Sequence, residues 1–131
     1  MEIHRLLKGD RFYLVHGISA FGGVNVDLET FGISECICSD IETWVVHYDF
    51  PPYLGGEEDI TEYRIEFEEH LPDGKIKRRL CDSTKGGGYA LAFAFPTHDE
   101  ASRYAIEKID LLIGEYKDKI GKLVFAKEQI K

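Results

Sequence analysis

The amino-acid sequence predicts an α+β fold, with a mainly antiparallel sheet of about five to seven strands and one long C-terminal helix packed on one face. Two observations support this fold class. Over most of the chain, apolar and polar residues alternate with a period of two, as in strands that bury one face. From Thr97 onward, apolar residues recur with the period of a helix. The length of 131 residues predicts a single domain, residues 1–131.

The first half of the chain is predicted to fold into strands. Residues 11–18 and 24–31 alternate apolar and polar side chains. Adjacent glycines between them favour a turn, so the two segments predict a hairpin. Residues 35–39 and 43–48 are rich in β-branched and aromatic residues and are separated by Asp40. They form either two short strands or one bent strand.

The clearest strand pattern follows a long loop. Residues 49–59 contain adjacent prolines and adjacent glycines, which predict the longest loop of the chain. Residues 61–71 alternate aromatic or aliphatic side chains with charged ones. A Pro-Asp-Gly turn leads to a partner strand, 76–81. We expect Lys77 and Arg79 to face the glutamates of the preceding strand.

The last predicted strand leads directly into the helix. Residues 89–95 are apolar on both faces, which predicts a strand in the centre of the sheet. Thr97 and Glu100 have the spacing of a capping box, which predicts where the helix begins. Apolar residues recur with helical spacing up to Ile120, and Gly121 predicts the end of the helix. The remaining residues form either a final strand or a short second helix.

The charge of the chain excludes several classes of partner. Sixteen basic and twenty-four acidic residues give a net charge of −8, which argues against direct nucleic-acid binding and against anionic membranes. No apolar run is long enough for a membrane span. The odd number of cysteines does not fit a disulfide framework. We therefore expect a cytoplasmic protein whose field attracts a basic partner.

The cysteines are candidates for metal binding. Cys36, Cys38 and Cys81, together with His16 or His47, nominally supply zinc ligands. Structural zinc sites usually take paired sulfurs from tight turns, whereas a Cys-x-Cys pair on a strand does not curl around an ion. We expect the thiols to pack as small apolar side chains, with no metal and no cofactor.

Thiol catalysis is a second hypothesis for the cysteines. It requires a cysteine activated by a nearby histidine, and Cys81 with His98 is the best-placed pair in the sequence. Nothing around Cys81 marks it as a nucleophile. We therefore predict no catalytic residue.

The leading hypothesis is a small, acidic, non-enzymatic protein-binding domain of the inhibitor, immunity or anti-defence type. The long loop and its flanking segments combine aromatic anchors with carboxylates that steer a basic partner. The predicted binding residues are Trp44, Tyr48, Tyr53, Leu54, Glu57, Glu58, Asp59, Glu62, Glu66 and Glu68.

Two alternatives belong to other classes. In the first, the aromatic face of the sheet lines a cup that binds a small apolar ligand or acts as an enzyme. The rings of that face are Tyr63, Phe67, Tyr89, Phe93 and Phe95. In the second, the chain is a structural subunit that assembles as a homo-oligomer.

Overall fold

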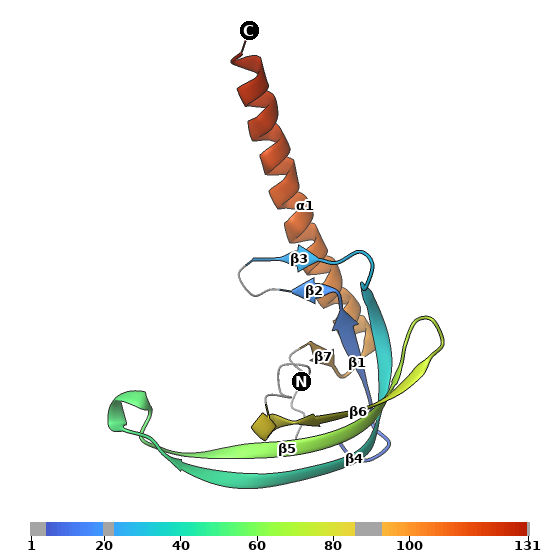
Figure 1. The fold of residues 1–131 in the computed structure, drawn as a ribbon, viewed down its shortest axis with the longest axis vertical. Helices are drawn as coiled ribbons and strands as arrows, with labels where there is room; N and C mark the ends of the chain where they lie inside the picture. Colours follow the sequence, from blue (N-terminus) through green and yellow to red (C-terminus); the bar gives the residue numbers. More distant parts are fainter. Residues whose placement is uncertain (1–4, 20–22, 86–92, 131) are drawn as a thin grey trace.

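The computed structural model describes residues 5–19, 23–85 and 93–130, and it confirms the predicted α+β class. These residues form a five-stranded antiparallel sheet, a separate two-stranded sheet and one long helix (Figure 1). The elements are β1 (Arg11–His16), β2 (Ile18–Ser19), β3 (Asn25–Val26), β4 (Gly32–Asp49), the 3-10 helix η2 (Pro52–Leu54), β5 (Glu57–His70), β6 (Ile76–Asp82), the 3-10 helix η3 (Ser83–Lys85), β7 (Ala94–Phe95) and α1 (His98–Glu128). The strand order in the larger sheet is β6-β5-β4-β1-β7.

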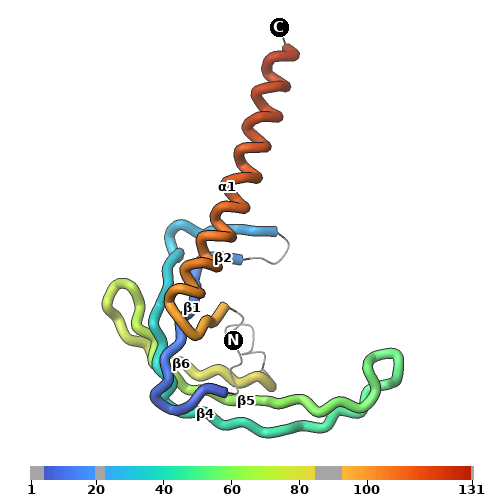
Figure 2. The backbone as a smooth tube through the Cα atoms, turned by 180° about the vertical axis from the view of Figure 1, so that it is seen from behind, coloured from blue at the N-terminus to red at the C-terminus, as the bar shows by residue number. Residues whose placement is uncertain are grey.

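The break predicted at Asp40 is a bend within one strand. β4 is continuous over 18 residues, and its pairing with β5 shifts between Cys38 and Asp40, where β4 has one extra residue. Such a bulge bends a strand and increases its twist. β4 and β5 run on together as a long curved ribbon that extends away from the rest of the molecule (Figure 2).

The predicted hairpin of residues 11–18 and 24–31 is shorter than expected. Gly17 has φ +79° and separates β1 from β2. A Cβ at this position would lie 2.6 Å from the Cα of Phe31, so only glycine permits the close approach. β2 and β3 pair over two residues each, and residues 28–30 form a turn.

Two apolar clusters form the core. The first contains buried side chains from the five strands of the larger sheet: Phe12, Leu14, Cys36, Cys38, Ile65, Phe67, Cys81 and Ala94. Within it, the rings of Phe12 and Phe67 pack edge to face with centroids 5.1 Å apart. The second lies under the start of α1 and contains Val15, Ile18, Ala101 and Ala105. The small alanines allow the helix to approach the sheet closely.

The strand that was predicted at residues 89–95 in the centre of the sheet is placed differently in the structure. Residues 89–92 lie outside the described part of the chain. Ala94 and Phe95 pair with β1 at the end of the strand order rather than in the centre of the sheet.

The helix begins where it was predicted and ends later. Thr97 Oγ1 accepts a hydrogen bond from the Glu100 amide at 3.2 Å, as expected of the helix cap. The predicted end at Gly121 is wrong, because α1 continues to Glu128. Gly121 does not adopt the left-handed conformation of a C-terminal glycine. A glycine inside a helix costs only about 1 kcal/mol relative to alanine, which does not force an end.

Much of the helix has no cover from the sheet. Its buried residues, Ala101 and Ala105, lie near its start, and the C-terminal part projects beyond the sheet (Figure 1). No helix among the described residues is long and apolar enough to cross a membrane.

Candidate functional site

The outer parts of β4 and β5 form a two-stranded arm. β1 pairs with β4 only as far as Ile37, and the pairing of β6 with β5 begins at Arg64. We call residues 43–63 the acidic arm, because they contain five carboxylates and no lysine or arginine. The carboxylates belong to Asp49, Glu57, Glu58, Asp59 and Glu62. The arm therefore concentrates negative charge on a ribbon whose base, at Glu62 and Tyr63, contacts Ser83 and the first core cluster, and whose outer part extends away from the body (Figure 2).

The register gathers most of the predicted binding residues on one face of the ribbon. Directly opposed residues of an antiparallel pair share a face, and successive residues alternate between faces. Trp44 lies opposite Glu62, and Tyr48 lies opposite Glu58. Alternation along β5 extends the same face toward the body of the protein. It carries Trp44, Tyr48, Glu58, Glu62, Glu66 and Glu68.

The other predicted binding residues lie apart from this face. Glu57 and Asp59 project from the opposite face, where Asp59 Oδ1 is 2.7 Å from Nδ1 of His47. Tyr53 and Leu54 lie in η2 at the tip of the arm, with 84% and 61% of their surfaces exposed. The structure thus separates the predicted set into one acidic and aromatic face, an opposite rim and an apolar tip.

Hydrogen bonds hold Glu62 at the base of the arm. The hydroxyl of Tyr48 donates to Oε1 of Glu62 at 3.1 Å, and the hydroxyl of Ser83 donates to Oε2. The hydrogen bond to Glu62 raises the pKa of Tyr48, because loss of the phenol proton would place two negative charges together. The ring of Tyr48 also stacks on Phe50, with centroids 5.5 Å apart.

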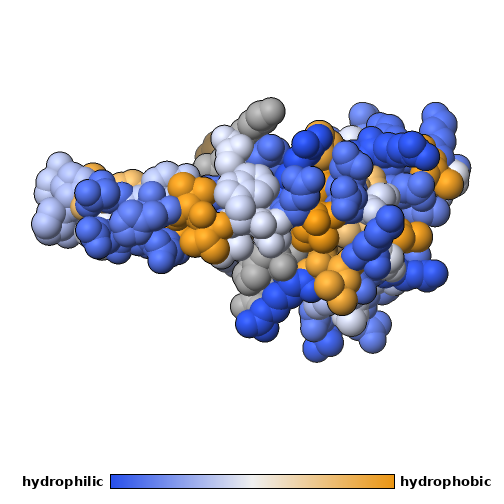
Figure 3. Space-filling model, turned by 90° about the horizontal axis from the view of Figure 1, so that it is seen from below, coloured by the Kyte–Doolittle hydropathy of each residue, from blue (hydrophilic) through white to orange (hydrophobic). Residues whose placement is uncertain are grey.

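The surface of the arm is mainly hydrophilic. Figure 3 views the ribbon from below, with the arm pointing left, and shows mostly blue side chains interrupted by apolar patches. Val45 is one of the exposed apolar residues, with 68% of its surface accessible. This mixture resembles the composition of non-obligate interfaces, where a few apolar anchors lie within a polar rim.

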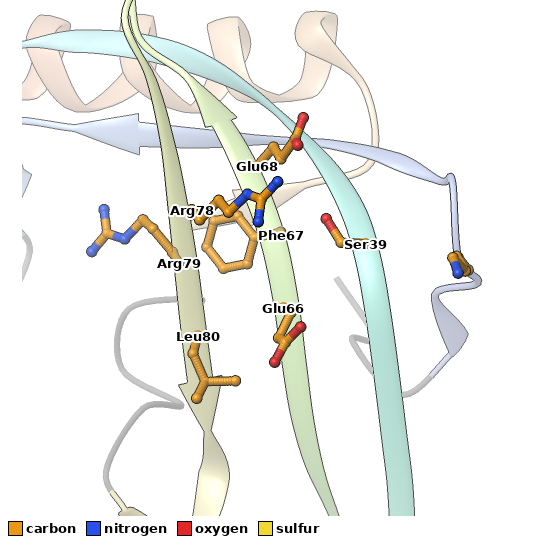
Figure 4. A pocket seen from close by; sticks show the side chains of 8 residues that line it. Ser39, Glu66, Phe67, Glu68, Arg78, Arg79 and Leu80 are labelled. Atoms are coloured by element: carbon orange, nitrogen blue, oxygen red, sulfur yellow. The ribbon is translucent and has the colours of Figure 1, made fainter.

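Glu66 and Glu68 belong to a different environment, although they share a face with the arm. They line a hollow of about 620 Å³ together with Arg78, Arg79 and Lys8 (Figure 4). Nη2 of Arg64 lies 4.0 Å from Oε1 of Glu66, and Nε2 of His70 lies 4.0 Å from Oε2 of Glu68. The carboxylates that have no lysine or arginine among them lie farther out, on the arm.

Lys77 and Arg79 face Glu69 on the core side of the sheet, not the glutamates on its wet side. Lys77 lies opposite Glu69 and Arg79 lies opposite Phe67, whereas Arg78 lies opposite Glu68 and Leu80 opposite Glu66. The register was predicted from alternation alone. The turn between the two strands determines it, and that turn places Arg79 on the core side.

Glu69 is a buried carboxylate on that core side. Its Oε2 accepts a hydrogen bond from the hydroxyl of Ser34 at 2.7 Å and lies 2.5 Å from Nε2 of His16. Its Oε1 accepts a hydrogen bond from Nη1 of Arg79 at 3.1 Å. Burial alone would raise the pKa of Glu69, but these hydrogen bonds and the charge of His16 lower it below the ordinary value.

The Glu69 cluster lacks the geometry of a catalytic relay. In a serine triad, the hydroxyl and the carboxylate bind different ring nitrogens of the histidine. Here both Ser34 Oγ, at 2.9 Å, and Glu69 Oε2 approach the same Nε2 of His16. The side chain of Ser34 is buried, so a substrate has no access to its hydroxyl. The cluster binds three strands of the sheet together, with Arg79 joining from a fourth.

Glu69 was not among the predicted site residues. The sequence feature that indicates a buried carboxylate is the pair Glu68-Glu69 within an alternating strand. Adjacent residues of a strand point to opposite faces, so one of the two carboxylates must lie on the core side. A buried carboxylate requires donors. His16 on β1 supplies one of them from the core face of the sheet.

The three cysteines are buried, as predicted. Burial raises the pKa of Cys36 to about 12 and also raises the pKa values of Cys38 and Cys81. A buried thiol with a raised pKa is a poor nucleophile. Within residues 5–19, 23–85 and 93–130, no group of three or more His, Cys, Asp or Glu residues is arranged to hold a metal ion.

The rings of the predicted aromatic cup do not share one face of the sheet. Phe67 belongs to the first core cluster, and Tyr63 packs against it. Phe93 and Phe95 pack with Tyr104 of α1, at centroid distances of 6.0 and 5.0 Å, in the second cluster. Tyr89 lies outside the described residues.

Comparison of the chain with known protein families, with curated proteins and with solved structures found no match.

Proposed function

We propose that this chain is a non-enzymatic protein-binding domain whose acidic arm docks on a basic surface of a partner protein. A small inhibitor, immunity or anti-defence protein would act in this way, by covering a cationic site that its partner needs. The observation that carries the proposal is the acidic arm, a ribbon that projects from the body of the protein with five carboxylates and no lysine or arginine.

The shape and composition of the arm support this function. A two-stranded ribbon with an apolar tip reaches into a concave surface more readily than the flat face of a sheet does. Trp44 and Tyr48 supply rigid aromatic contact area beside Glu62 and Glu58, and such rings often dominate binding energies at interfaces. The carboxylates add long-range attraction, which accelerates association with a cationic partner.

Matched charge variants test the proposal. In the arm variant, Asp49 and Asp59 become Asn, and Glu57, Glu58 and Glu62 become Gln. In the control variant, Asp27 and Asp73 become Asn, and Glu29, Glu115 and Glu128 become Gln. Both variants lose the same charge, but the control keeps the arm intact. Each protein is immobilised and exposed to host extract, and the bound proteins are identified.

We expect the wild type and the control to retain the same basic protein, and the arm variant to lose it. Retention falls as the salt concentration rises from about 50 to 500 mM, because ions screen exposed charges. Trp44 is the single tryptophan of the chain, so its emission reports contact at the arm when the purified partner is added. A partner that binds the wild type and the arm variant equally well contradicts the proposal.

A further inference from the structure

The helix α1 carries an apolar stripe that continues beyond the sheet. Six apolar residues follow one another at intervals of three and four residues in turn, which is the heptad spacing of a coiled coil. We call these residues the seam; they are Ile106, Ile109, Ile113, Tyr116, Ile120 and Leu123. Only the N-terminal part of the seam is shielded by its own chain, where Ile109 packs against the second core cluster.

The exposed part of the seam places apolar side chains in contact with solvent. Tyr116, Ile120 and Leu123 have 55%, 60% and 69% of their surfaces exposed. Two glycines, Gly114 and Gly121, interrupt this half of the helix, and each costs about 1 kcal/mol relative to alanine. A helical segment with these residues gains stability by burying its apolar side against a partner.

A groove beside the seam extends the apolar surface. It has a volume of about 310 Å³ and lies between α1 and the segment formed by β3 and the turn that follows it. Its lining consists of Val26, Leu28, Phe31, Ile109, Leu112, Ile113 and Tyr116. The groove and the seam form one continuous apolar surface on one side of α1.

We propose that the seam binds the same helix of a second copy of this chain in antiparallel orientation. When Ile113 of one copy faces Tyr116 of the other, every seam residue has an apolar partner. Ile109 then faces Ile120, and Ile106 faces Leu123. The projecting half of each helix covers the seam and groove of the other copy.

Charge complementarity favours a second copy of this chain as the partner and an antiparallel orientation of the two helices. In this register, Asp110 of each copy lies beside Lys117 of the other, at the positions that flank the seam. A parallel pair brings no opposite charges together at its flanking positions. Residues 98–113 contain four acidic and two basic residues, whereas residues 114–130 contain three acidic residues and four lysines. Antiparallel pairing places the acidic half of one helix along the basic half of the other.

The charge of the remaining chain favours the same arrangement. Residues 1–97 contain 17 acidic and 9 basic residues, a net charge of −8, whereas residues 98–131 are neutral overall. Antiparallel helices place the two acidic bodies at opposite ends, where their repulsion is weak. This pairing does not depend on the docking of the acidic arm, and loss of either leaves the other intact.

Two pairs of substitutions test the dimer by analytical ultracentrifugation at about 100 µM, because assembly follows mass action. Ile120→Glu with Leu123→Glu places charges in the seam. Leu111→Glu with Phe125→Glu is the matched control, because these exposed apolar residues lie on the side of the helix away from the seam. We expect the wild type and the control to sediment as dimers and the seam variant as a monomer.

Charge reversal tests the orientation. Asp110→Lys alone and Lys117→Asp alone should each weaken the dimer about five- to tenfold, because two symmetric pairs become repulsive. The double variant D110K/K117D should restore the wild-type dissociation constant. The emission of Trp44, which lies on the arm, verifies that every variant keeps its folded sheet.

Three results would overturn the proposal. A monomeric wild type at this concentration shows that the seam does not bind a second copy. The same result is expected if the seam binds an apolar ligand instead. A control variant that dissociates as fully as the seam variant shows that another side of the helix forms the contact. A double variant that remains as weak as the single ones excludes the antiparallel register.

Discussion

Glu69 shows how a single residue connects strands that are far apart in the sequence. Its two oxygens receive hydrogen bonds from β4 and β6 and contact His16 on β1. Because the carboxylate is buried, its donors must be positioned accurately, and the same requirement constrains the register of the surrounding strands. A cluster of this kind stabilises one arrangement of the sheet over its alternatives.

Replacing Glu69 by Gln tests that role. The substitution removes the charge and replaces one carboxylate oxygen by an amide NH2 group, which then faces other hydrogen-bond donors. The free energy of unfolding at neutral pH should therefore fall by about 1–3 kcal/mol. Urea titration followed by Trp44 emission measures this change. Glu68→Gln, on the opposite face and half-exposed, is the control and should change stability by less than about 0.5 kcal/mol.

The same variant should alter the pH dependence of stability. Folding lowers the pKa of Glu69, so its carboxylate stabilises the fold above the ordinary pKa of 4.5. This contribution is lost as the pH falls through the lower, folded-state pKa. The wild type should therefore lose more stability than Glu69→Gln when urea titrations are repeated below about pH 4.5. Identical pH slopes for the two proteins would show that Glu69 does not carry this effect.

Cys36 provides a second test at the level of one residue. Its thiol is buried, and its pKa of about 12 leaves almost no thiolate at pH 8. We expect a thiol reagent such as iodoacetamide to leave Cys36 unlabelled in the folded protein and to label it rapidly in urea. Leu54→Cys at the exposed arm tip is the positive control, read by peptide mass spectrometry. Labelling of Cys36 at the rate of the tip cysteine would contradict its packing.

The elements of the fold could be predicted to different degrees. The start of α1 was predictable, because Thr97 and Glu100 form a local motif. Its end was not, because Gly121 is compatible with both a cap and a helix interior, and the choice depends on the residues that follow. The sequence around Asp40 was compatible with two short strands or one bent strand. It could not decide between them, because the bulge depends on the pairing of β4 with β5.

Gly114 and Gly121 allow a test of the helix as an element. A Cβ added at either position would meet no atom within 4 Å. Gly114→Ala and Gly121→Ala should each stabilise the protein by about 0.5–1 kcal/mol and raise its helical circular dichroism. Gly17→Ala is the opposite case, since its positive φ and the contact with Phe31 make it destabilising. A loss of stability in the two helix variants would show that a partner lies against these glycines.

At the scale of the whole molecule, a small body supports two projecting elements. The core clusters lie where β1, the inner parts of β4 and β5, and the start of α1 meet. The acidic arm and the C-terminal half of α1 both extend beyond them (Figure 1). This division separates the core of the fold from two projecting elements, to which we assign the proposed contacts with other molecules.

Shortening the arm tests this division. Residues 47–59 are replaced by Asn-Gly, which joins the directly paired Val46 and Ile60 by a two-residue hairpin turn. We expect the free energy of unfolding to change by less than about 1 kcal/mol, because the removed residues make no core contact. Binding to a basic partner should be lost. A large loss of stability in urea titrations would show that the arm belongs to the folding unit.

The candidate site could be predicted in its composition but not in its shape. The acidic and aromatic residues of the long loop and its flanks were recognisable as a group. Their division between two faces and a tip depends on the bulge after Cys38, which reverses the alternation of β4. Glu66 and Glu68 joined the group by sequence proximity, and only the fold reveals the arginines beside them. The continuation of the seam to Leu123 was hidden by the expected helix end at Gly121.

The arm also exposes main-chain amides and carbonyls along the outer sides of β4 and β5, where no described strand pairs with them. Unpaired sides of this kind attract strands of other molecules and seed fibrils. Like charge on neighbouring arms opposes that addition. The five carboxylates thus have a second consequence, since their repulsion hinders the growth of an intermolecular sheet from these exposed edges.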